Sequence, residues 1–264
     1  MAQAYRKTRV LKARREGKYL VCRLAAPWRA EEVRPGRFMM VRIPGDGEMM
    51  FGRPFGISRK GEGWVEFTAA VAGRGTRILY DTVEEGSHLE VLGPLGNGYE
   101  IPAGAERIIL AGGGAGAAEL LALAEELAAE GRPPVFIAGA RSEADLVLLD
   151  ELRRASRELV VVTEDGSAGE KGLVTAPLGR KLAEEGADLV AACGPTPMLH
   201  AVAEMCAERG AECLVAAEER MACGVGACYG CCIPVLRDGE VKMVRVCLDG
   251  PVFRGEEFTG GGRG

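Results

Sequence analysis

Hydrophobic and polar positions along the first hundred residues follow the pattern of short strands separated by turns. Apolar runs, some of them alternating with polar residues, occupy residues 17–27, 36–44, 63–72 and 87–94, and glycine or proline stands close to each run. Such runs bounded by chain-breaking residues are typical of β-strands. Because no helical pattern intervenes, the sequence predicts an antiparallel β-barrel or sandwich over residues 1–100.

From residue 101 the pattern changes to apolar strands that alternate with Ala/Leu/Glu-rich helical segments. Buried strands are predicted at residues 106–113, 133–140, 158–165, 188–195 and 211–219. Helices are predicted over residues 117–131, 144–156, 178–187 and 196–210. Alternation of this kind predicts a doubly wound parallel α/β domain over residues 101–216, which leaves residues 217–264 as a small C-terminal segment.

Composition and charge exclude several classes of function. The 264-residue chain is 47% hydrophobic with a formal net charge of −5, which favours neither nucleic acid nor a membrane surface as a partner. The most apolar stretch, residues 108–127, is interrupted by glycines and glutamates, which disfavours a membrane span. The basic N-terminus has neither the apolar region nor the cleavage site of a signal peptide. We therefore expect a cytoplasmic protein.

Cysteines gather near the C-terminus in "ERMACGVGACYGCCIPV", residues 219–235, which holds four of the nine. In a reducing compartment, clustered thiols more often bind metal than form disulfides. The spacing Cys223-x4-Cys228-x2-Cys231, followed by the distant Cys247, is the plant-type pattern for a 2Fe–2S cluster. Glycines between the thiols let the backbone turn tightly and direct N–H groups at sulfur. We predict that these four cysteines ligate the cluster.

Other interpretations of the cysteines stay open at this point. Cys232 is one residue off the spacing, and adjacent side chains point apart, which favours Cys231 without excluding an exchange of the two. A structural zinc site also takes four thiolates, although x4 spacing among glycines suits it less. Buried free cysteines are a third possibility, and we expect this state for Cys22, Cys206 and Cys213.

A glycine-rich turn, "ILAGGGAGAAEL", joins the first predicted strand of the α/β domain to its first helix. Gly112, Gly114 and Ala117 fit the G-x-G-x-x-A pattern of dinucleotide-binding turns. Such a turn brings backbone N–H groups and a helix N-terminus to a pyrophosphate. The match alone is weak because glycine turns also serve tight packing, but the strand–turn–helix context favours a nicotinamide dinucleotide.

Residues that would contact the ribose and nicotinamide are less well determined by the sequence. Glu143 and Asp145 stand where a ribose partner is expected, roughly twenty residues past the turn, with Arg141 and Ser142 beside them. The choice between NADH and NADPH therefore stays open. Cys193, at a predicted strand end, lies where nicotinamide approaches in this sheet type, although a small buried residue is an equally good interpretation.

Two motifs in the predicted barrel suit a flavin diphosphate. "GRPFGIS" sets Arg53 beside Pro54 and Phe55, and "VAGRGTR" sets Gly75-Thr76 in a turn between two arginines. Arginine makes bidentate contacts to phosphate, and glycine lets backbone N–H groups approach it. Either motif alone is more often an ordinary solvated arginine. Together with the downstream dinucleotide turn, they favour FAD.

The order of these motifs resembles the electron-transfer subunit family of class 1B dihydroorotate dehydrogenases, within the ferredoxin-reductase superfamily. "RPFGIS", "GRGT", "GPLGNGY", "LAGGGAGAAEL", "AACGPTPML", "ERMACGVGACYGC" and "VCLDGPVF" carry this resemblance over nearly the entire chain. It implies an FAD-binding barrel, an NAD-binding domain, and the same four cysteine ligands. The residues that it implies in contact with FAD are Arg53, Pro54, Phe55, Gly56, Thr68, Ala69, Ala70, Gly75 and Thr76.

The resemblance also implies a partner and a reaction. The partner would be an FMN-containing catalytic subunit that oxidises dihydroorotate in pyrimidine biosynthesis, and the assembly would be a heterotetramer. Nicotinamide moves two electrons at once and a 2Fe–2S cluster moves one, whereas a flavin does both. We therefore expect electrons to pass from FMN through the cluster and FAD to NAD⁺. No acid–base catalytic residue is expected, and His88 and His200 are interpreted as surface or helix residues.

Two residues depart from the family pattern. The family usually has serine where Gly56 stands, so a hydroxyl near the flavin is missing unless Ser58 substitutes. It usually has proline where Glu119 stands. A carboxylate there would weaken nicotinamide binding or lie harmlessly on the helix.

Three other functions compete with this interpretation. One is a flavin/iron–sulfur subunit of another NAD(P)H oxidoreductase, acting on ferredoxin or sulfide. Another is a non-enzymatic redox sensor that uses the cluster as a switch. The last is a zinc-stabilised binding module.

Overall fold

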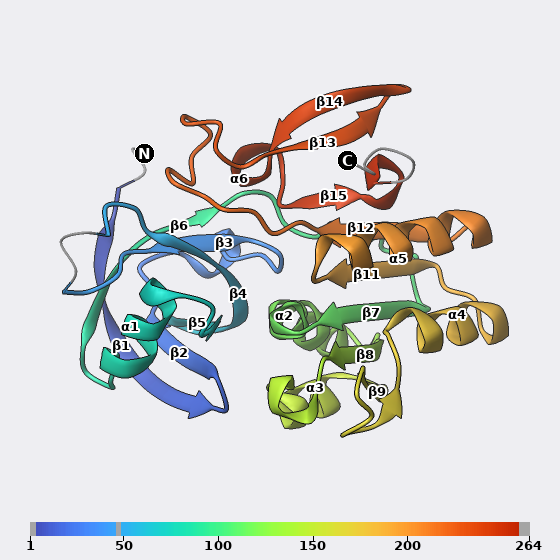
Figure 1. Ribbon diagram of the computed structural model, residues 1–264, viewed down its shortest axis with the longest axis horizontal. Coiled ribbons are helices and arrows are strands. Elements are labelled where there is room, and N and C mark those ends of the chain that lie inside the picture. The colour runs from blue at the N-terminus through green and yellow to red at the C-terminus, as the bar shows by residue number, and fades with distance from the viewer. Residues whose placement is uncertain (1–3, 46–48, 259–264) are drawn as a thin grey trace.

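The computed structural model describes residues 4–45 and 49–258, and its N-terminal part is a closed β-barrel (Figure 1). Neighbouring strands follow the order β1-β2-β5-β4-β3-β6, and every pairing is antiparallel. The strands are β1 (Arg6–Glu16), β2 (Tyr19–Ala25), β3 (Phe38–Val41), β4 (Arg53–Gly61), β5 (Trp64–Ala70) and β6 (His88–Leu95). The predicted barrel is therefore confirmed.

The sequence pattern did not predict two strands and one helix of the barrel. β1 is rich in exposed arginine and lysine, and β4 begins with "RPFG", so neither shows a clear apolar alternation. "GRGT" does not form the expected turn, because Arg74–Thr82 is a helix, α1. Thr76 Oγ1 accepts the N–H groups of Ala72 and Gly73 at 2.9 and 3.1 Å, which caps the helix start.

The second part of the chain is a seven-stranded sheet in the order β10-β9-β8-β7-β11-β12-β15, and its strands from β10 to β12 are parallel. Its strands are β7 (Ile108–Gly113), β8 (Val135–Ala140), β9 (Glu158–Thr163), β10 (Glu170–Lys171), β11 (Leu189–Cys193), β12 (Glu212–Ala216) and β15 (Val252–Arg254). The strand order reverses between β7 and β11, which makes their carboxyl ends the switch point where ligands bind in such sheets. The doubly wound prediction is confirmed.

Helices cover both faces of this sheet. They are α2 (Ala115–Ala129), α3 (Leu149–Ala155), α4 (Thr175–Glu184) and α5 (Thr196–Arg209). Alternate residues of β7 enter different cores: Ile108 and Leu110 pack with α2 and α3, whereas Ile109 and Ala111 pack with α4 and α5. Among the described residues, no helix is long and apolar enough to cross a membrane.

Helix boundaries differ from the expected ones at two places. The helix predicted over residues 144–156 is a 3-10 turn at Glu143–Asp145, a loop, and then α3. Leu148 adopts a φ of 58° immediately before α3, which prevents one continuous helix. α4 begins three residues before the predicted start, because Pro177 is tolerated in the first turn of a helix.

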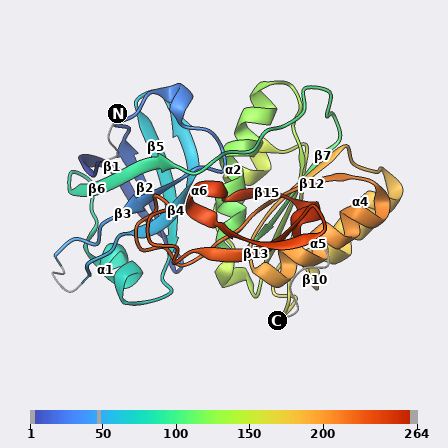
Figure 2. The same ribbon diagram turned by 90° about the horizontal axis from the view of Figure 1, so that it is seen from above.

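The described part of the C-terminal segment lies along one side of the molecule, next to both the barrel and the large sheet (Figures 1 and 2). A hairpin of β13 (Cys232–Arg237) and β14 (Glu240–Arg245) leads into the short helix α6 (Val246–Asp249). β15 then pairs antiparallel with β12, so the chain returns to the large sheet after the cysteines. Val235, Val244 and Phe258 pack in one core with α5 and with barrel residues such as Met40.

Candidate functional site

The cysteine-rich loop and α6 place four cysteine sulfurs in two neighbouring pairs. Cys223 lies beside Cys228, Cys231 lies beside Cys247, and Cys223 is also close enough to Cys247 to influence its charge. Cys231 and Cys247 are buried, whereas Cys228 is exposed. Cys232 begins β13, where it pairs with Arg245 in the hairpin. This arrangement favours Cys231 over Cys232 as a ligand.

Backbone N–H groups of the loop point at these sulfurs. Gly226 N donates to Cys247 Sγ at 3.1 Å, and Cys247 N donates to Cys231 Sγ at 3.4 Å. Although burial opposes it, N–H groups of the loop, with the adjacent Cys228 thiol, lower the pKa of Cys223 to about 6. Thiolates that accept N–H groups are the donors an iron–sulfur cluster needs, so the residues present fit such a group.

The loop rests on the barrel. A β-carbon at Gly224 would lie 2.6 Å from Met40 Cγ and 3.2 Å from Leu95 Cδ1, so this glycine lets the loop lie directly on β3 and β6. The cysteine-rich loop and the predicted flavin barrel are therefore in contact.

The two barrel motifs come together, as a flavin diphosphate site requires. Arg53 begins β4, and a β-carbon at Gly75 of α1 would lie 3.4 Å from Arg53 Nε. A guanidinium thus stands beside a helix N-terminus, two features that both attract phosphate. Thr68 and Ala69 are buried in β5, whereas Ala70 lines the neighbouring cavity. Pro54 and Phe55 continue β4, with Phe55 stacked on Phe67 at 5.0 Å.

The glycine turn packs as the motif predicts. A β-carbon at Gly112 would lie 2.4 Å from Ala117 Cα, so the glycine and the small residue let α2 approach β7. Gly114 precedes α2 with a φ of 57° and donates its N–H to Gly139 O at 2.7 Å. Gly116, which the motif did not single out, allows the same helix to approach Cys193, because a β-carbon there would lie 2.2 Å from Cys193 O.

A cavity of about 610 Å³ opens at the switch point of the sheet. It is lined by Gly113, Gly114, Gly194, Pro195 and Met198, and by Tyr19 and Ala70 from the barrel. Its position at the carboxyl ends of β7 and β11 is the one expected for a dinucleotide.

The candidate ribose partners separate into two groups. Arg141 and Asp145 line the cavity, whereas Glu143 does not appear among its lining residues. Asp145 also forms an ion pair with Lys18 of the barrel, which lowers the pKa of its carboxyl. Glu164, at the end of β9, lines the cavity too, and only the sheet topology could have identified it.

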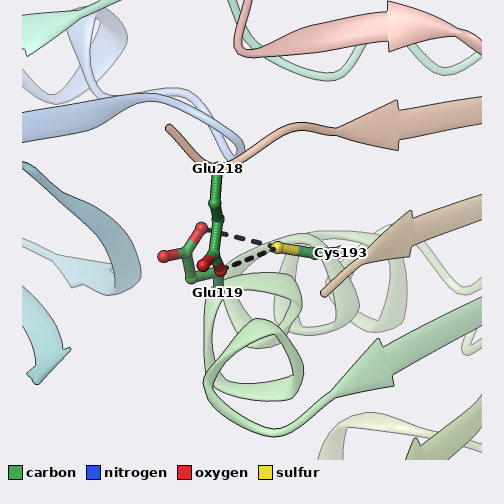
Figure 3. Close-up of side chains that lie close together, drawn as sticks. All are labelled: Glu119, Cys193 and Glu218. Atoms are coloured by element: carbon green, nitrogen blue, oxygen red, sulfur yellow. Dashed lines mark hydrogen bonds between the residues drawn. The ribbon is translucent and has the colours of Figure 1, made fainter. Parts of the chain in front are cut away.

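Three further side chains meet where the cavity faces the barrel (Figure 3). Glu119 of α2, Cys193 of β11 and Glu218 after β12 place one ligand atom each within 4.8 Å of the others. Ser58 does not replace the hydroxyl absent at Gly56: it is fully buried and donates to Glu66 O at 3.0 Å. The carboxylate of Glu119 reaches the position next to Gly56 instead.

Two family models and many curated proteins match this chain. Residues 218–259 match the iron–sulfur cluster binding domain of dihydroorotate dehydrogenase B, and residues 110–204 match an oxidoreductase NAD-binding domain. The electron transfer subunit of NAD⁺-dependent dihydroorotate dehydrogenase B from Caldanaerobacter subterraneus subsp. tengcongensis is 40% identical over 95% of this chain and 97% of its own. The chain belongs to this family of electron-transfer subunits.

A second family member and a solved structure support the assignment. The corresponding subunit from Bacillus velezensis is 37% identical over 85% of this chain and 87% of its own. The solved structure of an NADH-dependent reduced ferredoxin–NADP oxidoreductase, reported in connection with flavin-based electron bifurcation, superposes on this chain with a TM-score of 0.79. It is 32% identical over 95% of this chain and 88% of that one. The family and fold support the predicted cofactor set of FAD, a 2Fe–2S cluster and NAD.

The remaining residues named from the sequence are also placed. Cys22, Cys206 and Cys213 are free and buried, as expected. His88 begins β6 and is exposed, and His200 in α5 contacts Phe258 O at 2.5 Å. Neither histidine is among the residues that line the dinucleotide cavity.

Proposed function

We propose that this chain transfers electrons from an FMN-containing dihydroorotate dehydrogenase subunit to NAD⁺ in the cytoplasm, through a 2Fe–2S cluster and FAD. The assembly would be a heterotetramer that serves pyrimidine biosynthesis. The main support for this proposal is that the cysteine-rich loop packs directly on barrel strands β3 and β6, in a chain that belongs to this family. An iron–sulfur cluster supplies single electrons, and a flavin converts them to the pairs that nicotinamide needs.

Each cofactor has a proposed set of residues. Cys223, Cys228, Cys231 and Cys247 would hold the cluster, because their sulfurs converge and accept backbone N–H groups. The residues that would contact FAD are Arg53, Pro54, Phe55, Gly56, Thr68, Ala69, Ala70, Gly75 and Thr76. Gly112, Gly114 and Ala117 would shape the turn that holds the nicotinamide dinucleotide.

Exposed apolar side chains on the hairpin that follows the cysteine-rich loop suit the catalytic subunit. Val241 and Met243 project from one side of β14, each 64% exposed. Arg245, next on that side, stacks on Tyr229 at 5.1 Å, and Leu248 lies against Gly226. Cys228, the exposed cysteine, lies in the same loop. Clustered exposed apolar side chains mark protein interaction sites, and this position would bring the partner's redox centre close to the cluster.

Replacing Met243 by aspartate is expected to weaken binding of the catalytic subunit by about a hundredfold or more, because a carboxylate would be buried in the interface. Binding measured by calorimetry or surface plasmon resonance checks this. Met50→Asp is the matched control, since Met50 is also an exposed methionine, at 79%, but precedes barrel strand β4. If both variants bind the partner with equal affinity, this face is not the docking site.

Replacing Arg53 by alanine is expected to weaken FAD binding by about tenfold to a hundredfold, the value of one charge-assisted hydrogen bond to phosphate. Fluorescence of released flavin measures the affinity. Arg77→Ala is the control, because Arg77 lies on the same helix as Gly75 but faces Asp81 at 3.8 Å. Equal losses in the two variants would contradict a specific contact at Arg53.

The function itself is tested by co-expression with an FMN-containing dihydroorotate dehydrogenase from the same genome. The purified complex should reduce NAD⁺ with dihydroorotate as the electron donor, and removal of this chain should abolish that activity. A complex that fails to form, or that passes no electrons to NAD⁺, would refute the proposal.

A second candidate function rests on the likeness to the ferredoxin–NADP oxidoreductase structure, which spans 95% of this chain. The chain would then be a subunit of another flavin/iron–sulfur reductase that exchanges electrons with ferredoxin. Reduced ferredoxin, supplied in place of dihydroorotate, distinguishes the two functions by which donor supports NADH formation.

A further inference from the structure

The carboxyl of Glu119 occupies the space in which a side chain at position 56 would stand. A β-carbon built on Gly56 would lie 2.4 Å from Glu119 Cδ and 2.5 Å from Glu119 Oε2, well inside van der Waals contact. The backbone N–H of Gly56 lies close enough to the same carboxyl to lower its pKa. Glu119 therefore connects the dinucleotide-binding helix α2 to the flavin-motif strand β4, and only glycine at position 56 leaves room for it.

Glu119 belongs to a small hydrogen-bonded group, not to an ion pair. The Cys193 thiol donates to Glu119 Oε2 at 3.6 Å and lies 4.0 Å from Glu218 Oε1 (Figure 3). Cys193 is buried and Glu119 half-buried, whereas Glu218 is exposed to the dinucleotide cavity that it lines. The three side chains thus form a path from the open cavity to Gly56.

Electrostatics favour protonated side chains throughout this group. Burial, reinforced by the charge of Glu218, raises the pKa of Glu119 to about 8, although Cys193 and Gly56 offset part of the rise. Burial also raises the pKa of the Cys193 thiol, and desolvation by the surrounding protein raises that of Glu218, although its side chain opens onto the cavity. The Tyr99 phenol, a further titratable group close to Cys193 and Glu119, is buried, and burial likewise raises its pKa. Near neutral pH, the group therefore retains a proton.

Reduction of NAD⁺ consumes one proton that an iron–sulfur cluster does not supply. The balance is NAD⁺ + 2e⁻ + H⁺ → NADH, and single electrons arrive at this junction without protons. Resting on the proposed function, we propose that Glu119 holds this proton on its carboxyl at the junction of barrel and dinucleotide cavity and would give it to the FAD held by the barrel as that group takes up two electrons, so that the proton and the electrons leave together as hydride to NAD⁺. The Glu119 carboxylate would then regain a proton from solvent through Glu218. A carboxylic acid on α2 thereby performs a role for which the barrel strand, with glycine at position 56, has no side chain.

The test compares wild-type holoprotein with Glu119→Gln, which keeps the shape of the side chain but cannot give up a proton. The part of the infrared carboxylic-acid C=O band that wild type has and Glu119→Gln lacks should titrate near pH 8, because it belongs to the Glu119 carboxyl. Glu126→Gln is the matched control on the same helix, where Glu126 forms a half-buried ion pair with Lys60 at 2.7 Å. Its band should equal that of wild type.

Thermal unfolding gives a second readout that needs no substrate. A carboxyl whose folded pKa is about 8 instead of 4.5 contributes stability that is complete below the lower value and lost as pH rises through the upper one. The melting temperature of Glu119→Gln should therefore rise relative to wild type between about pH 5 and about pH 9. The Glu126→Gln difference should stay constant over that range.

Activity and a paired substitution complete the test. NADH formation by Glu119→Gln should fall by about a hundredfold and lose the pH dependence near 8. Gly56→Ser should disturb wild type, because it displaces the Glu119 carboxyl, but restore activity to a Glu119→Ala protein by returning a hydroxyl to the same space. This pair keeps the proposal testable if Glu119→Gln folds poorly.

An unchanged infrared band and pH profile in Glu119→Gln would overturn the proposal, and so would equal effects of Gly56→Ser with and without Glu119. Loss of dihydroorotate-dependent activity in wild type would instead refute the proposed function. In that case the infrared and unfolding results would still report the state of Glu119.

Discussion

Replacing Cys228 by serine is expected to abolish the paramagnetic signal of the reduced cluster and electron transfer to the partner, while NADH-dependent reduction of artificial acceptors continues. Cys228 is the exposed member of the converging cysteines, and a serine hydroxyl is a poor substitute for thiolate at iron. The dinucleotide cavity and the Arg53 site lie outside the loop, so flavin and nicotinamide binding should survive. Electron paramagnetic resonance and an NADH:acceptor assay measure the two properties separately.

Cys232→Ser is the matched control for this experiment. Cys232 is adjacent to the proposed ligand Cys231 but belongs to the β13–β14 hairpin, so its loss should leave the signal and the electron transfer intact. Normal electron transfer by the Cys228 variant would refute the proposed ligand set. Loss of the signal in the Cys232 variant would show that Cys232, and not Cys231, is the ligand.

Replacing Gly112 by alanine is expected to destabilise the protein by about 1–3 kcal/mol and to weaken NADH binding by about tenfold or more. The new β-carbon would meet Ala117 Cα at 2.4 Å, which is backbone and cannot rotate away. α2 must therefore move outward, which carries its N-terminus away from the cavity at the switch point. Chemical denaturation measures the stability, and fluorescence titration measures the affinity.

Gly104→Ala controls for the general effect of replacing a glycine. A β-carbon at Gly104 meets no atom within 4 Å, so its stability and NADH affinity should stay near those of wild type. If Gly112→Ala binds NADH as tightly as this control, the glycine turn does not position the dinucleotide.

Much of the fold follows from local patterns that the sequence displays openly. Strands such as Ile108–Gly113 are continuous apolar runs, and the glycine turn after them is a short motif with a packing reason at each position. β1 was not predicted, because its outer positions are arginine and lysine and its own side chains show no strand pattern. It forms a strand because it pairs with β2 and β6. β4 was missed for a similar reason, since Arg53 and Pro54 open it.

The site could be predicted where its residues are close in sequence. The cysteine spacing identified the loop, but only the structure shows that Gly224 seats it on Met40 of the barrel. Gly56 and Glu119 were each recognisable as departures from the family pattern. That one fills the space left by the other depends on how the barrel packs against α2, which no local pattern encodes.

The return of β15 to the edge of the large sheet, beside β12, has a consequence for loading with iron. Both ends of the cysteine-bearing stretch are tethered to neighbouring strands of one sheet, so it is topologically an insertion between them. A chain that has lost its metal is therefore expected to keep the pairing of β12 with β15 and to become disordered only in the stretch between them. Iron could then bind again without refolding of the rest of the protein.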